Sequence, residues 1–402
     1  MFKIDALNIL TIIACANAFL WLVGLLITVR SISKHKPLKA FDKELSNKPF
    51  VSILVPARNE EHRWLIQSML SFLSQDYDNF EIVAVNDRST DKTGEILREI
   101  AKSNKKLKVI EGKDLPDGWL GKPHALQQAF ESSQGEWILA TDADMIFNRR
   151  AIRTVINHAL TNNYDAVTLL PHIECLSFWE CVLVPTLGWY GVMAWSIEKV
   201  NNPKRKKALG VGGFFLIKRE ALKKIDEYKG VKAEVIEDLR TAENLKRSGA
   251  KLRMEYAPDL ARTRMQTNLK ELWEGFTKNL FAGTKFSLAK TFFGLSSILL
   301  FAVTPPLIAF VCALLILFGG YNELIKLFIP CALIYVFQAL IYAVVNHKWK
   351  IPLWYALVTP LGHALFTAIL INSTVKIISG QGVTWKGRKF YERGGIKPSS
   401  EF

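Results

Sequence analysis

Two aspartates separated by one residue end a hydrophobic run, in the segment Asp142-Ala143-Asp144. Side chains two positions apart on an extended chain point to the same side, so both carboxylates can offer oxygen ligands to Mg²⁺ or Mn²⁺. A metal held there would bridge a diphosphate and neutralise charge on a leaving group. Exposed turns also carry this spacing, so its meaning depends on the residues around it.

A lysine stands upstream of the aspartates, in Gly121-Lys122-Pro123. Proline suits the first turn of a helix, which places Lys122 at a helix start, where an anion is attracted. Lys122 is then either a phosphate contact or a solvated surface lysine. Asp87 follows another β-branched run and is in position to accept a hydrogen bond from a base or a ribose.

Two further acids, Glu237 and Asp238, open a helical pattern that continues to residue 246. A carboxylate here can serve as the general base that deprotonates an acceptor hydroxyl. Negative charge at a helix N-terminus is also stabilised by the helix dipole alone. By spacing alone, the second interpretation is favoured.

The elements that must position these residues alternate between strand and helix over 49–267. Strands are predicted at 51–55, 81–85, 107–110 and 137–140, and helices near 60–74, 91–103 and 122–133. Such alternation predicts an α/β domain with a mainly parallel sheet, whose ligands bind beyond the carboxyl ends of the strands. Dinucleotide binding is disfavoured, because no GxGxxG follows the first strand.

Composition separates a charged domain from apolar segments. Lys and Arg total 52 against 37 Asp and Glu, and much of this excess flanks apolar runs, which favours a membrane over nucleic acid as the partner. The first 30 residues predict a transmembrane helix. The basic linker 31–48 follows it, which places that side in the cytosol. The five cysteines form no CxxC pair, which fits a reduced, cytosolic domain.

The C-terminal third is predicted to be largely apolar. Interfacial amphipathic helices are expected at 268–290, three transmembrane segments within 291–375, and a basic tail at 376–402. The first of the three segments contains Pro305-Pro306, where a kink is expected, and Pro360 lies within the third. Another apolar stretch, 176–197, is either an interfacial helix or a buried core helix.

Taken together, the ordered motifs resemble the family 2 glycosyltransferases, whose catalytic domain has the GT-A fold. They are VSILVPARNEE (51–61), VNDRSTD (85–91), GWLGKPHALQQA (118–129), ATDADM (140–145), GVGGFFLIKREAL (210–222) and VIEDLR (235–240). The flanking apolar segments and the tail motif at 382–388 resemble bacterial lipid-modifying members. These include the hopanoid- and carotenoid-associated enzymes and, more distantly, the ceramide glucosyltransferases.

The resemblance implies roles for individual positions. The nucleotide-sugar side comprises Pro56, Glu60, Asp87, Lys122 and Asp142. Asp144, with Asp142, would hold the metal and diphosphate, and Asp238 would be the catalytic base of an inverting reaction. The acceptor side comprises Gly212, Gly213, Glu237 and Trp273.

The chain departs from the family at one motif. Processive members carry QxxRW after the base, whereas Leu269 and Leu272 stand where Gln and Arg would precede Trp273. Single-sugar transfer is therefore favoured over polymer synthesis, and Arg264 or Lys278 is the candidate for the diphosphate contact.

The resulting hypothesis is a multi-pass hexosyltransferase in a prokaryotic cell membrane, with its catalytic domain in the cytosol. It would use a nucleotide-diphosphate-sugar, with UDP-sugar as the family expectation, and a lipid acceptor. The alternatives are a processive polysaccharide synthase and a non-catalytic nucleotide-sugar-binding protein.

Overall fold

The computed structural model of the protein describes residues 6–392 and 396–398. The first five residues of the predicted N-terminal segment, and residues 393–395 and 399–402 of the predicted basic tail, lie outside the described residues. The chain divides into two compact units. The sheet unit comprises 37–174, 191–265 and 382–402, and the helical unit comprises 1–36, 175–190 and 266–381.

A seven-stranded sheet is the centre of the sheet unit, in the order β3-β2-β1-β4-β8-β6-β9. Its strands are β1 (Val51–Ala57), β2 (Phe80–Asn86), β3 (Leu107–Glu111), β4 (Trp137–Ala140), β6 (Ala166–Leu170), β8 (Phe215–Lys218) and β9 (Leu252–Tyr256). The first four run parallel, and β8 is antiparallel to both of its neighbours. This arrangement confirms the predicted mainly parallel α/β fold.

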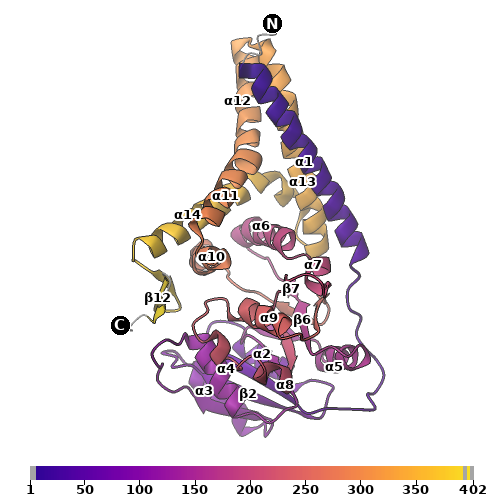
Figure 1. Ribbon diagram of the computed structural model, residues 1–402, viewed down its shortest axis with the longest axis vertical. Helices are drawn as coiled ribbons and strands as arrows, with labels where there is room; N and C mark the ends of the chain where they lie inside the picture. The colour runs from indigo at the N-terminus through magenta and orange to yellow at the C-terminus, as the bar shows by residue number, and fades with distance from the viewer. Residues whose placement is uncertain (1–5, 393–395, 399–402) are drawn as a thin grey trace. The chain divides into compact units, whose positions relative to one another are not determined.

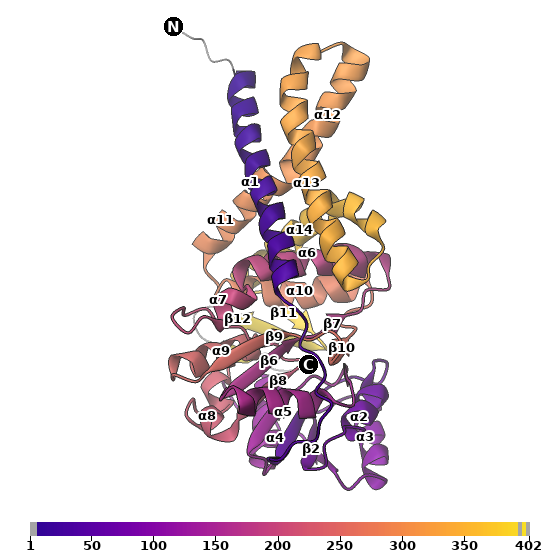
Figure 2. The same cartoon turned by 90° about the vertical axis from the view of Figure 1, so that its right-hand side faces the viewer.

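Both faces of the sheet are covered by helices, which explains why its strands are nearly continuous apolar runs. Along β1, Ile53 and Val55 pack into one core and Leu54 into the other. The first core receives α2 (Leu65–Leu73), α3 (Thr93–Lys102) and α5 (Ala151–Thr161). The second receives α4 (Gly121–Glu131), α8 (Arg219–Lys223) and α9 (Glu237–Arg247), and both sets are visible in Figure 2.

Smaller elements complete the sheet unit. One short sheet has the order β5-β10-β7, formed by β5 (Met145–Phe147), β10 (Ala261–Thr263) and β7 (His172–Ile173). Another is built from the C-terminal residues, with β11 (Val383–Trp385), β12 (Arg388–Glu392) and β13 (Ile396–Pro398). The helix α7 (Ile197–Asn201) packs against β9.

The helical unit contains four spans that are long and apolar enough to cross a membrane, counted over the described residues. They are Ala6–Lys34, Leu288–Gly319, Asn322–Trp349 and Leu353–Ile378. One is N-terminal and three are C-terminal, as predicted. In Figure 1, α1 (Ala6–Lys34) runs beside α13 (Ile325–Trp349), which also contacts α12 (Thr304–Gly319).

Three prolines in the C-terminal spans stand where helices begin, whereas Pro330 lies inside α13. A π-helical turn (Leu299–Val303) joins α11 (Leu288–Ile298) to α12, whose first turn holds Pro305 and Pro306. Likewise, Pro360 lies in the first turn of α14 (Thr359–Ile378). Proline is tolerated there, because the first N–H groups of a helix have no intrahelical acceptor. The unit also contains α10 (Leu269–Gly283) and most of α6 (Phe178–Ala194).

Candidate active site

The predicted site residues of the sheet unit gather at one edge of its sheet. Glu60 follows β1, Asp87 follows β2, and Asp142 with Asp144 follows β4. These three strands are adjacent and parallel, so their carboxyl ends meet. Because β8 runs the opposite way, the glycines before it, Gly212 and Gly213, also lie at this edge.

Lys122 joins two acidic segments that are far apart in sequence. Its Nζ lies 2.7 Å from Oδ1 of Asp142 and 2.7 Å from Oε1 of Glu237. Burial alone would lower the lysine pKa, but the carboxylates of Asp142, Glu237 and Asp238 raise that pKa well above its usual value. The lysine is therefore a fixed cation between the carboxylate pair after β4 and the start of α9.

Asp238 lies in the first turn of α9 and is held by backbone donors. Its Oδ2 accepts a hydrogen bond from the N–H of Gly212 at 2.7 Å, and its Oδ1 accepts one from the N–H of Leu239 at 2.7 Å. Burial and the neighbouring Glu237 raise the pKa of Asp238 to about 6, against the lowering effect of Lys122. A carboxyl group that titrates near neutral pH is suited to proton transfer.

A small cavity lies beside this carboxylate. Its lining includes Lys122, Gly212, Asp238, Tyr228 and Thr241. The hydroxyl groups of Tyr228 and Thr241 are buried and have no hydrogen-bond partner among the described residues. The cavity therefore offers polar groups next to the predicted base.

The carboxylate of Asp144 is crowded by other acids. Burial, Asp142 and Glu60 raise the pKa of Asp144 to about 6, while Lys386 and Arg63 act in the opposite direction. Nη1 of Arg63 lies 3.3 Å from Oδ2 of Asp144. A divalent cation would relieve this crowding, so the residues present fit the predicted metal.

The protein ligands for such a metal are few. Among the described residues, no group of three or more His, Cys, Asp and Glu side chains is arranged to hold a metal ion. Mg²⁺ is commonly bound by one or two carboxylates together with substrate phosphates and water. Asp142 and Asp144 match that kind of site, in which the substrate would complete the ligand set.

A glycine before β8 lets the backbone approach two charged side chains. A Cβ on Gly212 would lie 2.9 Å from Nζ of Lys122 and 3.1 Å from Oδ2 of Asp238, so the backbone here approaches both charged groups closely. A Cβ on Gly213 would instead meet Sδ of Met145 at 2.6 Å. Gly212 therefore faces the charged groups, whereas Gly213 packs against Met145.

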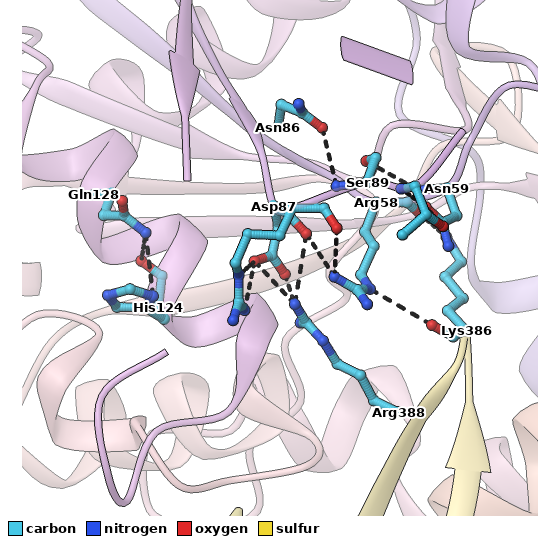
Figure 3. Close-up of polar contacts among 11 residues, drawn as sticks. Arg58, Asn59, Asn86, Asp87, Ser89, His124, Gln128, Lys386 and Arg388 are labelled. Atoms are coloured by element: carbon cyan, nitrogen blue, oxygen red, sulfur yellow. Dashed lines mark hydrogen bonds and ion pairs between the residues drawn. The ribbon is translucent and has the colours of Figure 1, made fainter. Parts of the chain in front are cut away.

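The nucleoside side of the predicted site contains cations whose roles could not be predicted from the sequence. The carboxylate of Asp87 accepts hydrogen bonds from Arg88, at 2.9 and 3.2 Å, and from Arg388, at 2.7 and 3.3 Å. Nη1 of Arg58 donates to the backbone oxygen of Asp87 at 2.8 Å, and Lys386 forms an ion pair with Glu60. Figure 3 shows Arg58 and Arg388 converging on Asp87. The only sequence signal for the tail residues was the motif at 382–388.

Four other predicted residues lie on β1, after β10 or on α10. Pro56 is on β1, paired with Val85 of β2. Arg264 follows β10 in the sheet unit, whereas Trp273 and Lys278 are on α10 in the helical unit. The roles of all four stay predictions.

Comparison with solved structures defines the class of fold. The chain is similar to the mannosyltransferase PcManGT from Pyrobaculum calidifontis, solved in complex with GDP-Man and Mn²⁺. The TM-score is 0.54 at 19% sequence identity, over 92% of this chain and 98% of that one. The sheet unit thus has a GT-A-like fold, as the sequence predicted.

Sequence comparison matches one segment of the chain to a known family. Residues 52–226 match the family model Glycosyl transferase family 2. A β-monoglucosyldiacylglycerol synthase from Nostoc sp. is 41% identical over 107 residues, which is 26% of this chain and 22% of that protein. A 4,4'-diaponeurosporenoate glycosyltransferase from Staphylococcus aureus is 26% identical over 255 residues, which is 62% of this chain and 66% of that protein. Each match covers less than two thirds of the relative's own length.

Proposed function

We propose that this protein transfers a single sugar from a nucleotide-diphosphate-sugar to a lipid acceptor at the cytosolic face of a membrane, with inversion at the sugar. One observation carries the proposal. Lys122 joins the aspartate pair after β4 to the start of α9, so a diphosphate site and a base with raised pKa adjoin. The family 2 domain supports the reaction class.

In the proposed reaction, Asp238 accepts the proton of the acceptor hydroxyl through its carboxylate. The acceptor oxygen then forms a bond to the anomeric carbon, and the bond between that carbon and the diphosphate oxygen breaks on the opposite face. The nucleoside diphosphate leaves with the electron pair. The hydrogen bond from the Gly212 N–H holds Asp238 in place for this step.

The diphosphate would be received by the residues after β4. Asp142 and Asp144 would hold Mg²⁺ or Mn²⁺, which when bound supplies positive charge to the leaving diphosphate. Lys122 adds a fixed cation beside the pair. On the nucleoside side, Glu60 is 5% exposed and its Oε2 has no hydrogen-bond partner among the described residues. That oxygen lies 3.7 Å from Nε of Arg63, beyond hydrogen-bond distance, so it can still accept a hydrogen bond from a base or ribose.

The lipid acceptor is supported by the helical unit and by the relatives. Four apolar spans fit a multi-pass protein that meets its acceptor at the bilayer. The basic residues after the first span, Arg30 and Lys34 among them, favour a cytosolic sheet unit. Both relatives compared above carry lipid-directed names, a diacylglycerol and a diaponeurosporenoate.

A donor screen tests the proposal. Detergent-solubilised full-length protein is incubated with a panel of UDP- and GDP-sugars, Mn²⁺ or Mg²⁺, and a total bacterial lipid extract, and products are read by mass spectrometry. A glycolipid with one added sugar is expected, and it should be lost with EDTA and in Asp144→Ala. Asp78→Ala is the matched control. Asp78 is an exposed aspartate just before β2, at the opposite end of that strand from Asp87.

Other outcomes would contradict parts of the proposal. A ladder of sugars would replace single transfer with polymer synthesis. Binding of a donor without any product would favour a non-catalytic role. Equal product from the Asp144→Ala and Asp78→Ala proteins would remove the aspartate pair from the reaction.

A further inference from the structure

The C-terminal residues of the sheet unit form a hairpin whose turn faces the predicted nucleotide site. Strand β11 pairs antiparallel with β12, and Trp385 is opposite Arg388. The turn between them is Lys386-Gly387, and both residues have positive φ, at 47° and 77°. A two-residue turn of this kind matches the twist of paired strands, so the sequence Trp-Lys-Gly-Arg positions Lys386 and Arg388 on one tight structure.

The side chain of Arg388 is buried and lies in a closely fitting site. Its side chain is 7% exposed and that of Asp87 is 5% exposed, and the two form a forked pair of hydrogen bonds at 2.7 and 3.3 Å. A Cβ on Gly121 would lie 1.8 Å from Nη1 of Arg388, so the start of α4 has room for the guanidinium only because position 121 is glycine. Two segments distant in sequence from the hairpin, at Asp87 and at Gly121, are thus fitted around this side chain.

Lys386 lies on the metal side of the same cluster. Its Nζ forms an ion pair with Oε1 of Glu60 and donates a hydrogen bond to the backbone oxygen of Arg58 at 3.1 Å. Oε2 of the same Glu60 carboxylate lies 3.7 Å from Nε of Arg63, whose Nη1 lies 3.3 Å from Oδ2 of Asp144. Lys386 therefore stands between a predicted nucleoside residue and a predicted diphosphate residue. The carboxylate of Glu60 still keeps Oε2 without a hydrogen bond to any described residue.

The acidic sheet edge needs positive charge to bind an anionic donor, and the hairpin supplies Lys386 and Arg388. The predicted donor carries a negatively charged diphosphate, yet the sheet edge presents Glu60, Asp87, Asp142, Asp144, Glu237 and Asp238. A buried charge pair is weak evidence for stability, because desolvation offsets the attraction. Charge-assisted hydrogen bonds do, however, provide strong and specific recognition of phosphates.

We propose that the hairpin formed by β11 and β12 is part of the donor-binding site. Lys386 contacts the diphosphate of the nucleotide-sugar, and Arg388 is a positioning residue whose pairing with Asp87 fixes the hairpin at the nucleoside side. The inference rests on the proposed function, because it takes a nucleotide-sugar as the ligand. It assigns donor recognition to a segment that lies outside the matched family domain, residues 52–226.

The test measures nucleotide binding, which needs neither acceptor nor turnover. Isothermal titration of UDP and of GDP, each with Mn²⁺, is made on full-length protein in detergent. Lys386→Ala and Arg388→Ala should each weaken binding by roughly 10-fold or more, as expected for a lost hydrogen bond to a charged group. Lys389→Ala is the matched control. Lys389 is the neighbouring exposed lysine on β12, and its loss should leave the affinity within about twofold.

Two further variants separate positioning from folding. Gly121→Ala should mimic Arg388→Ala, because its Cβ would displace the same guanidinium and also crowd Oδ2 of Asp87. Arg388→Lys keeps the charge but loses the fork, so its affinity should fall between those of wild type and Arg388→Ala. Thermal unfolding of each variant confirms that it is folded. If Arg388→Ala does not fold, Lys386→Ala decides alone.

The outcomes distinguish this inference from the function on which it rests. Wild-type protein that binds neither UDP nor GDP would overturn both. If wild-type protein binds a nucleotide, and Lys386→Ala and Arg388→Ala bind it as tightly as Lys389→Ala does, the inference alone would be overturned. Tighter binding in those two variants would also overturn it, because the hairpin would then compete with the nucleotide.

Discussion

The raised pKa of Asp238 makes the acid limb of the pH-rate profile a test of the proposed base. Burial and Glu237 raise this pKa to about 6, and Lys122 lowers it. If Asp238 must be ionised to accept a proton, kcat/KM should fall below about pH 6. Replacing the two neighbours should move that limb in opposite directions. Lys122→Gln removes the cation and shifts the limb to higher pH, whereas Glu237→Gln removes a like charge and shifts it to lower pH.

The expected size of each shift follows from how close the charges lie. A Cβ on Gly212 would be 2.9 Å from Nζ of Lys122 and 3.1 Å from Oδ2 of Asp238, so these two atoms are at most about 6 Å apart. A charge within about 4–6 Å moves a carboxyl pKa by roughly 1–3 units. Lys122 shares its charge between Asp142 and Glu237, each 2.7 Å away, so its effect on Asp238 belongs at the lower end of that range. We therefore expect apparent pKa values of about 7 in Lys122→Gln and about 5 in Glu237→Gln. The two limbs would then differ by about two pH units.

The assay is kcat/KM for sugar transfer between pH 4.5 and 9, with each profile scaled to its own plateau. Scaling removes any loss of donor affinity, which is expected in Lys122→Gln. Lys218→Gln is the matched control. Lys218 is also an ion-paired lysine, 3.1 Å from Asp165, but it lies at the far end of β8 from Gly212. If neither limb moves, or if both move in the same direction, Asp238 is not the group that the limb reports.

Three other predictions concern the free energy of unfolding and the turnover of single-residue variants. Folding raises the pKa of Asp144 from 3.8 to about 6, so the free energy of unfolding falls as pH rises between these values. Asp144→Asn removes the ionisable group and should stabilise the protein at pH 7 by about 1–2 kcal/mol, while transfer is lost. An unchanged or lower melting temperature would contradict this expectation. Gly135→Ala should destabilise by about 2 kcal/mol or more, because its Cβ would meet the Ser52 backbone N at 2.5 Å, whereas Gly191→Ala, with open space around it, should not destabilise; urea unfolding compares the two. Gly212→Ala should leave the melting temperature near that of wild type but lower kcat/KM by about tenfold or more, because the added Cβ would crowd the carboxylate of Asp238. A kcat/KM equal to that of wild type would refute the close approach of the Gly212 backbone to Asp238.

Strand positions could be predicted from the sequence because strands buried on both faces form continuous apolar runs. The predicted strands 51–55 and 81–85 lie within the observed β1 and β2, which extend one or two residues further. The direction of β8 could not be predicted in this way, because a buried antiparallel strand has the same composition as a buried parallel one. Its direction is what brings Gly212 to the sheet edge.

The residues of the site could be predicted from the sequence, but the side chains that each of them contacts could not. The sequence offered Lys122 as a phosphate contact or a surface lysine, and neither option included a bridge between Asp142 and Glu237. A bridge of this kind depends on tertiary contacts between segments about 20 and 115 residues away, and spacing carries no information about them.

The pairing of Asp87 with Arg388 is the extreme case, since the two residues are 301 positions apart. It changes the meaning of the predicted nucleoside residue. A carboxylate that already accepts hydrogen bonds from Arg88 and Arg388 has little remaining capacity to bind a ribose directly. Glu60, by contrast, keeps a buried oxygen without a hydrogen bond to any described residue. On this argument Glu60 is the direct nucleoside contact, and Asp87 acts by holding the hairpin in place. Asp87→Asn should then weaken nucleotide binding to the same extent as Arg388→Ala, and the two changes together should cost no more than either alone.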